Sequence, residues 1–176
     1  MSIVKYNNNS ISDVTSGASL ASGAMTLIKT LTASSSATLS FVDGSSDVVL
    51  DSTYPIYVFK CINIHPATDN VKFNVNFRDG GSSYDATKTT TIFRAFHKEN
   101  DASTNLNYET GSDLAQSTSG ATISIELGNG SDECCSGTLH LFDPSNTTFV
   151  KHFLITTSSS NYEDQIFNPY VAGYCN

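Results

Sequence analysis

The chain of 176 residues contains no tryptophan, only four prolines and four cysteines, and no long run of apolar residues. No stretch approaches the roughly 18 consecutive apolar residues of a membrane-spanning helix, and the N-terminus lacks the apolar segment of a secretory signal. We therefore expect a protein that is made in the cytoplasm without a signal peptide and does not insert into membranes.

Charged residues are also scarce, since Asp, Glu, Lys and Arg make up 15% of the chain. The 17 acidic residues outnumber the nine basic ones, which gives a net charge of −8, and the basic residues form no cluster. Because nucleic acid binding needs a basic stripe, this distribution argues against direct contact with DNA or RNA. The polar surface comes instead from Ser and Thr, which supply 46 residues, as is typical of β-proteins.

The four cysteines have neither the spacing of a disulfide framework nor a C-x-x-C metal motif. Cys61 lies within an apolar run and is expected to be a small buried residue. The adjacent pair Cys134 and Cys135 is interpreted as structural, with metal binding or cross-linking as the alternative. We predict no metal site and no cofactor.

Signatures of enzymes are absent, including the G-x-S-x-G elbow, the H-E-x-x-H zinc motif and glycine-rich phosphate loops. We interpret the four histidines as packing or surface residues. Many acidic residues stand in turn contexts such as Asp43-Gly44 and Asp79-Gly80, where a carboxylate caps local backbone. Two facing carboxylates of a glycan-cleaving enzyme, or a calcium-binding loop at 43–47 or 129–133, are the alternatives. We expect no catalytic residues.

Alternation of apolar and polar residues predicts strands at Val71–Arg78 and Thr122–Leu127, each followed by a glycine-containing turn. The run Ile56–Ile64 is apolar on nearly both faces, which predicts a central strand covered on both sides. A helical turn is expected at Ser112–Gln116. Further strands are predicted at Met25–Leu31, Ala37–Phe41, Thr89–Phe96, Gly137–Phe142, Thr148–Thr156 and Tyr170–Tyr174.

No long window keeps the apolar period of a helix, and about eight to ten short strands are expected. The sequence therefore predicts an all-β protein, with residues 25–176 forming a single antiparallel, jelly-roll-like β-sandwich. Residues 1–24 hold few large apolar side chains. We expect them to form an extended N-terminal arm that becomes ordered on a partner surface.

Three tyrosines, Tyr84, Tyr108 and Tyr162, lie in polar segments that are expected to be loops. Exposed aromatic rings beside amide and carboxylate groups are typical of glycan-binding sites. The sequence allows these three residues as a glycan-binding platform. The alternative interpretation is that they fix the loops to the sandwich.

Five segments together resemble a known family: SIVKYNNNSIS, GAMTLIKTLTASSSATLSFVDG, VVLDSTYPIYVFKCINIHPATDNVKFNVNFRDGGSSYDATKTTT, GTLHLFDPSNTTFVKHF and NPYVAGYCN. They are similar to short virion structural proteins of marine bacteriophages, of the tail, fibre or capsid-surface type. The resemblance implies a lectin-like or jelly-roll sandwich. It also implies a further β-rich stretch after the AGY segment, so we expect that strand to be missing here or supplied by a neighbouring subunit.

The resemblance and the absence of catalytic motifs together predict a non-enzymatic virion structural protein, which decorates the capsid or forms part of a tail or fibre. We expect it to assemble with itself, as a homo-oligomer, and with other virion proteins through its N-terminal arm and sheet edges. The alternative is a carbohydrate-binding adhesin module that recognises host surface glycans.

Overall fold

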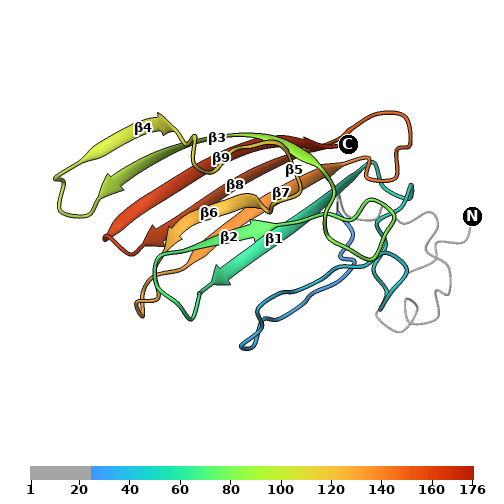
Figure 1. Ribbon diagram of the computed structural model, residues 1–176. Coiled ribbons are helices and arrows are strands. Elements are labelled where there is room, and N and C mark those ends of the chain that lie inside the picture. The colour runs from blue at the N-terminus through green and yellow to red at the C-terminus, as the bar shows by residue number, and fades with distance from the viewer. Residues whose placement is uncertain (1–24) are drawn as a thin grey trace, which may run out of the picture. The chain divides into compact units, whose positions relative to one another are not determined.

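The computed structural model describes residues 25–176, which form strands and loops without a helix (Figure 1). All nine strands belong to the unit Ala33–Asn176, and residues 25–32 belong to a separate unit. The all-β prediction is confirmed. Nothing in residues 25–176 is a helix long and apolar enough to span a membrane. The predicted arm, residues 1–24, lies outside the described residues.

Six antiparallel strands build the larger layer, in the order β1-β7-β8-β9-β3-β4. Their bounds are β1 Ile56–Ile64, β3 Lys88–Lys98, β4 Thr104–Tyr108, β7 Cys135–Phe142, β8 Lys151–Asn161 and β9 Gln165–Cys175. Successive side chains of a strand point to opposite faces, and β8 and β9 accordingly alternate between buried and more exposed residues along most of their length. One face of this layer is therefore buried.

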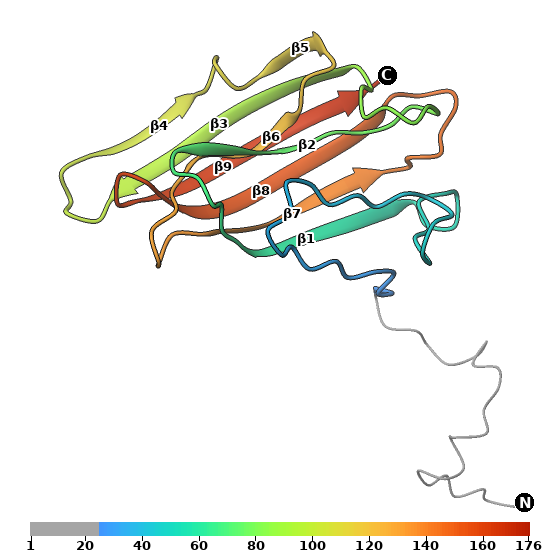
Figure 2. The same cartoon turned by 60° about the horizontal axis from the view of Figure 1, so that its bottom comes forward.

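A second, smaller layer covers that buried face (Figure 2). It is formed by β2 (Val71–Val75), which pairs with β6 (Ala121–Leu127), while β5 (Leu114–Ser117) pairs with the start of β3. The layers also meet through polar groups, since the Thr157 hydroxyl donates to the Ile123 carbonyl over 2.8 Å. The two layers form an antiparallel sandwich, and its jelly-roll character stays a prediction.

The core lies between the layers and is centred on Phe153, which is fully buried. Gly173 on β9 lies against this ring, and a Cβ atom there would overlap the ring and approach the Thr90 methyl to 2.8 Å. Phe153 thus occupies space that any side chain at position 173 would need. The core also contains Ala86, Ile92, Ala121, Ile123, Leu139, Leu141, Ile155, Val171 and Cys175.

The strand predicted at Ile56–Ile64 is confirmed with the same bounds, but its predicted central position is wrong. Within the described residues β1 pairs only with β7 and forms one end of the layer. Two of its apolar side chains are exposed to solvent: Ile56 is 47% and Ile62 is 71% exposed. The sequence pattern of β1 shows that both faces of the strand are apolar, but it does not show which part of the protein covers each face.

Strands were also predicted at Met25–Leu31 and Ala37–Phe41, and both predictions are wrong because neither stretch pairs with another strand. Part of the following stretch is held by local turns instead, such as the bond from the Gly44 amide to the Val48 carbonyl. The helical turn predicted at Ser112–Gln116 is a reverse turn followed by β5. β4 escaped prediction because its sequence, TNLNY, is mostly polar and exposed. The remaining predicted strands appear as β2, β3, β6, β7, β8 and β9 with shifted ends.

Lys88 is a charged side chain that is fully buried at the start of β3. Its ammonium donates to the Ala86 carbonyl over 2.5 Å and to the Thr118 carbonyl over 3.5 Å. Burial lowers the pKa of this ammonium, because the charged form loses its hydration. Lys88 therefore releases its proton more readily in the folded than in the unfolded chain.

The Lys88→Met substitution is expected to change how stability depends on pH. Between the lowered pKa of folded Lys88 and its ordinary value, the unfolded chain binds more protons, so this residue makes the free energy of unfolding rise with pH. Lys88→Met removes that contribution. The Lys88 charge also lowers the pKa of the buried Cys175 thiol, so its removal raises that pKa further and makes the stability of the variant fall more steeply with pH, in the same direction. Urea unfolding at several alkaline pH values should show any stability advantage of the variant shrinking as pH rises; an advantage that is constant or grows would contradict this account.

Candidate functional site

One face of the six-stranded layer points away from β2 and β6, and the contacts that other parts of the unit Ala33–Asn176 make with it include those of Gln116 with Thr89 and of Asp113 with Tyr108. We call it the outer face. It consists of the odd-numbered residues 89–97 of β3 and the even-numbered residues of the other five strands: 56–62, 104–108, 136–142, 152–160 and 166–174.

The outer face gathers many of the exposed apolar side chains. Eight of the fifteen large hydrophobic side chains found exposed among residues 25–176 lie on it. They are Ile56, Ile62, Phe93, Leu106, Tyr108, Leu154, Ile166 and Tyr170. These residues alternate with Ser, Thr and His residues on the same face. A concentration of exposed apolar side chains on one face marks a site of interaction, whereas scattered single ones are normal.

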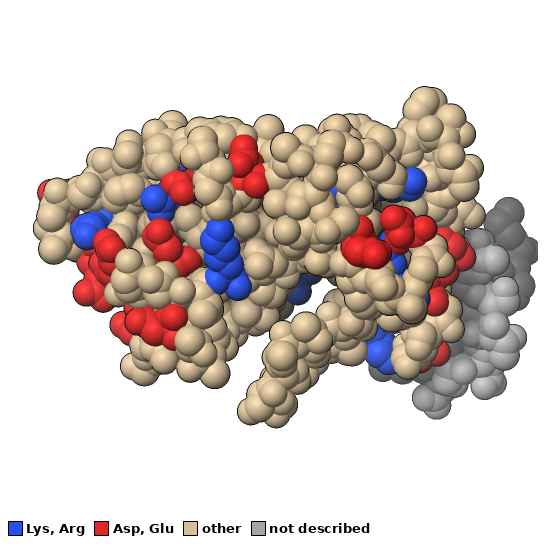
Figure 3. All heavy atoms as spheres, in the orientation of Figure 1, with Lys and Arg blue, Asp and Glu red and all other residues tan. Residues whose placement is uncertain are grey.

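The outer face carries no carboxylate, although the chain is strongly acidic. None of its residues, all of them described, is Asp or Glu, and Lys60 is its one permanently charged side chain. Figure 3 looks onto the side of β2 and β6, where the visible acidic side chains gather mainly toward the two ends of the strands. Two carboxylates adjoin the outer face at its β4 end: Asp113 beside Tyr108, and Asp101, which lies 3.0 Å from the His97 ring nitrogen.

Three aromatic rings form a row across the outer face. Phe93 on β3 is paired with Tyr108 on β4 and with Tyr170 on β9, so all three side chains point the same way. The rings of Phe93 and Tyr170 are parallel within 4°, with centroids 5.3 Å apart. The Tyr108 hydroxyl donates to the Asp113 carboxylate over 2.7 Å, and this bond raises the pKa of Tyr108. We call these three residues the aromatic row.

A shallow hollow of about 360 Å³ adjoins the aromatic row. Its lining includes Ala172, whose single methyl group makes the face dip beside Tyr170, together with Thr91 and Leu154 in the same cross-strand row. His152 and Tyr174 border the hollow with ring centroids 6.1 Å apart. The outer face therefore has a raised aromatic row and, in the adjacent cross-strand row, the hollow.

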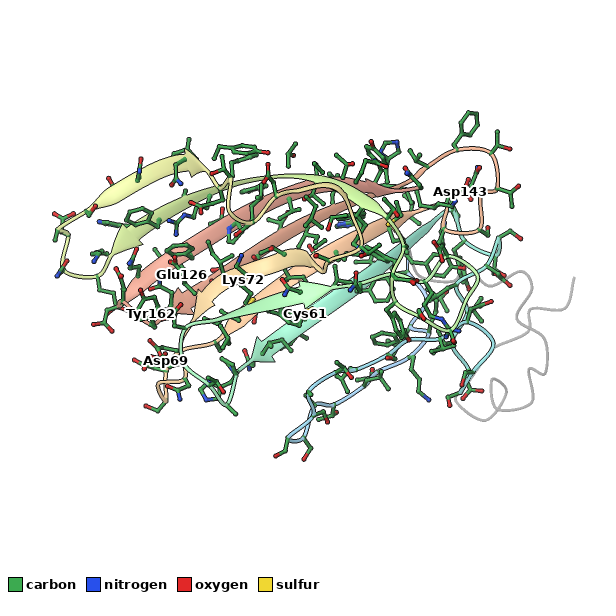
Figure 4. All side chains as sticks on the ribbon, in the orientation of Figure 1. Cys61, Asp69, Lys72, Glu126, Asp143 and Tyr162 are labelled. Carbon is green, nitrogen blue, oxygen red and sulfur yellow. The ribbon has the colours of Figure 1, made fainter. Side chains whose placement is uncertain are left out.

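The structure does not bring the three predicted tyrosines together. Tyr84 lies in the loop before β3, where the Arg78 guanidinium is 5.6 Å from its ring. Tyr162 lies in the β8–β9 turn, and its hydroxyl donates to Glu163 over 3.0 Å (Figure 4). Glu163 contacts Lys98 at the far end of β3, so the length of this strand separates the two tyrosines.

Tyr108 alone belongs to the outer face, and its neighbours Phe93 and Tyr170 were not identified from sequence. Each of them lies in a predicted strand at a position where alternation indicates its face. Their meeting depends on pairing between strands that are distant in the chain. Local pattern contains no signal for such pairing.

Glu109 and Glu126 are two carboxylates that share one cation, Arg94, on the other side of the layer. The Arg94 guanidinium contacts both, reaching Glu126 over 3.3 Å, and lies 4.3 Å from the centroid of the Phe167 ring. A shared cation neutralises the pair and holds it in place. This cluster braces β3 against β6, β9 and the end of β4.

Within the described residues no three His, Cys, Asp or Glu side chains come together to hold a metal ion. In the two loops considered for calcium, Asp43 accepts from the Leu50 amide over 2.8 Å and Glu133 accepts from the Gly130 amide.

All four cysteines are free thiols. Burial raises the pKa of Cys135 to about 12 and that of Cys175 to about 11, which keeps both protonated at neutral pH.

Comparison of the chain with protein-family models, with curated proteins and with solved structures gave no significant match. The outer face, with its aromatic row and hollow, is the surface from which a function is argued below.

Proposed function

We propose that the protein is a non-enzymatic structural component of a bacteriophage particle surface, in capsid decoration or in a tail or fibre. Two lines support the proposal: the resemblance of five sequence segments to virion proteins of marine bacteriophages, and the outer face. The outer face provides the structural support, because a sheet surface with eight exposed large apolar side chains suits binding to other proteins. The virion is the proposed location, reached from the host cytoplasm.

The chemistry of the hollow supports assembly over catalysis. Its titratable side chains are His152 and Tyr174, and the rest of its lining consists of Thr, Phe, Leu, Ala and Gly residues. The lining holds no carboxylate, amine or thiol beside these two rings. The surface supplies apolar area and hydroxyl groups, the composition that suits packing.

Purified phage particles provide the test of this proposal. Gold-labelled antibodies against the protein, viewed on intact virions by electron microscopy, should decorate the head or the tail at regular positions. Mass spectrometry of gradient-purified particles should find the chain at a fixed number of copies per particle. Particles that lack the protein would contradict a virion role.

A carbohydrate-binding adhesin is the second candidate, and the aromatic row is the observation that favours it. Tyr108 combines an exposed ring with a hydroxyl, and Thr156 lies beside Tyr170 in the same cross-strand row. On a glycan array, the Tyr108→Ala variant should then lose binding that the Tyr84→Ala variant keeps. An assembled wild-type protein with no signal above background would remove this candidate.

A further inference from the structure

We propose that the outer face is the surface on which a second copy of this chain packs, so that two sandwiches form a symmetric dimer through their six-stranded layers. The inference deepens the proposed structural role, on which it rests, by naming the partner and the contact surface. Five observations carry it: the area of the face, its charge, its shape, the sequence of β1 and the stacking of its rings.

The area of the outer face matches what a stable dimer needs. Six strands spaced about 4.8 Å apart span about 25 Å. The strands hold five to eleven residues, about nine on average, and at about 3.3 Å each these run for about 30 Å. The product is about 750 Å², close to the roughly 800 Å² per partner of a standard protein–protein interface. Contact between two outer faces therefore provides enough area for a stable dimer, without any other surface of the molecule.

The charge distribution permits two copies to meet on this face and opposes contact elsewhere. Two chains of net charge −8 repel one another. None of the outer-face residues is acidic, so a contact through it buries no carboxylate of the strands themselves. The two carboxylates that adjoin the face, Asp113 beside Tyr108 and Asp101 beside His97, lie at the β4 edge of the layer, where they can remain in solvent. Lys60 lies on β1, the edge strand of the layer, in the same cross-strand row as Tyr170. At this edge its long side chain can keep the ammonium hydrated.

The shape of the outer face is self-complementary. The aromatic row and the hollow occupy adjacent cross-strand rows, since Tyr170 and Ala172 are two residues apart on β9. Consider a two-fold axis that lies in the interface, parallel to these two rows and midway between them. Rotation about this axis places the aromatic row of each copy over the hollow of the other. The same residue pairs then meet twice, as symmetry requires of an isologous interface.

The sequence of β1 is that of a strand covered on both faces. Its inward residues Tyr57 and Phe59 contact the aromatic rings of Tyr54 and Phe41. Its outward residues Ile56 and Ile62 are 47% and 71% exposed. A second copy supplies the missing cover, which accounts for the apolar residues on both faces.

Stacking of the rings favours a protein over a glycan on this surface. Phe93 and Tyr170 stack on each other, so each ring has one face already engaged by its neighbour. A sugar that binds an aromatic platform needs an open ring face, whereas a packed apolar interface needs side chains held rigidly in place. The paired rings meet the second requirement.

Sedimentation velocity of the full chain tests the inference, with Leu154→Glu as the disrupting variant and Leu39→Glu as its matched control. Leu154 is 48% exposed near the centre of the outer face, and Leu39 is 43% exposed in a loop away from it. Wild type and Leu39→Glu should sediment as dimers. Leu154→Glu should dissociate with a Kd at least about 100-fold higher, because symmetry buries two uncompensated carboxylates. Circular dichroism checks that each variant is folded, and Thr156→Lys serves as the second disrupting variant.

Two results would overturn the interface: a wild-type chain that stays monomeric at the highest concentration prepared, or equal dimerisation of Leu154→Glu and Leu39→Glu. A monomeric wild type is also the expected result if another segment of the same chain covers the outer face. Neither result bears on presence in virions, so a monomeric protein found in particles would remove this inference alone. A dimer that is absent from particles would remove the virion role and leave the interface.

Discussion

Replacing Phe153 with alanine is expected to lower the free energy of unfolding by about 3–5 kcal/mol, because it deletes a fully buried ring from the centre of the core. The cavity forms where both layers converge, so the surrounding strands cannot close it easily. Phe149→Ala is the matched control, since this phenylalanine is 72% exposed, and it should cost less than about 0.5 kcal/mol. Urea denaturation of the three proteins measures both values; equal effects would contradict the position of the core.

The contact between Phe153 and Gly173 can be isolated by a double-mutant cycle. Gly173→Ala alone should destabilise by about 1–3 kcal/mol, because its methyl group overlaps the ring. In the Phe153→Ala background the same methyl enters the cavity, so the second substitution should cost far less. Gly111→Ala, which meets no atom within 4 Å, controls for the general effect of replacing glycine. Additive effects of the two substitutions would show that ring and glycine do not touch.

Replacing Arg94 with methionine is expected to destabilise the chain by about 2–3 kcal/mol. The substitution leaves Glu109, whose side chain is 17% exposed, and Glu126 without their shared cation. It also removes the guanidinium from the Phe167 ring, a contact worth about 0.5–2 kcal/mol in general.

The control for Arg94→Met is Lys98→Met, which breaks the more exposed pair with Glu163. Such exposed pairs contribute about 0–1 kcal/mol, so this variant should stay close to wild type. Thermal and urea unfolding at neutral pH compare the two. If both variants lose the same stability, the cluster around Arg94 is no stronger than a surface ion pair, and the prediction is wrong.

Local alternation was sufficient for much of the strand prediction. Strand β1 was predicted with its observed bounds, and the alternations at Val71–Arg78 and Thr122–Leu127 gave β2 and β6. This succeeded because side chains of a strand alternate with a period of two, which residue types record directly. It failed at β4, where polar side chains on both faces leave no alternation to detect.

The proposed binding surface could be predicted only in fragments. Tyr108 was singled out as an exposed aromatic residue, whereas Tyr84 and Tyr162 lie elsewhere and contact their own loops. The partners of Tyr108 on the outer face come from β3 and β9, and β9 lies far along the chain. Register between distant strands depends on the whole set of pairings, so no local pattern could reveal the row.

By itself, the sequence determined that this protein is all-β, that its strands have one face suited to a core, and that β1 is apolar on both faces. Tertiary structure alone decided which face was covered, and it left the outward residues of β1 and β9 open on one carboxylate-free surface. The physical reason is that alternation is a property of a single strand, whereas cover depends on which strands pair and where the second layer packs.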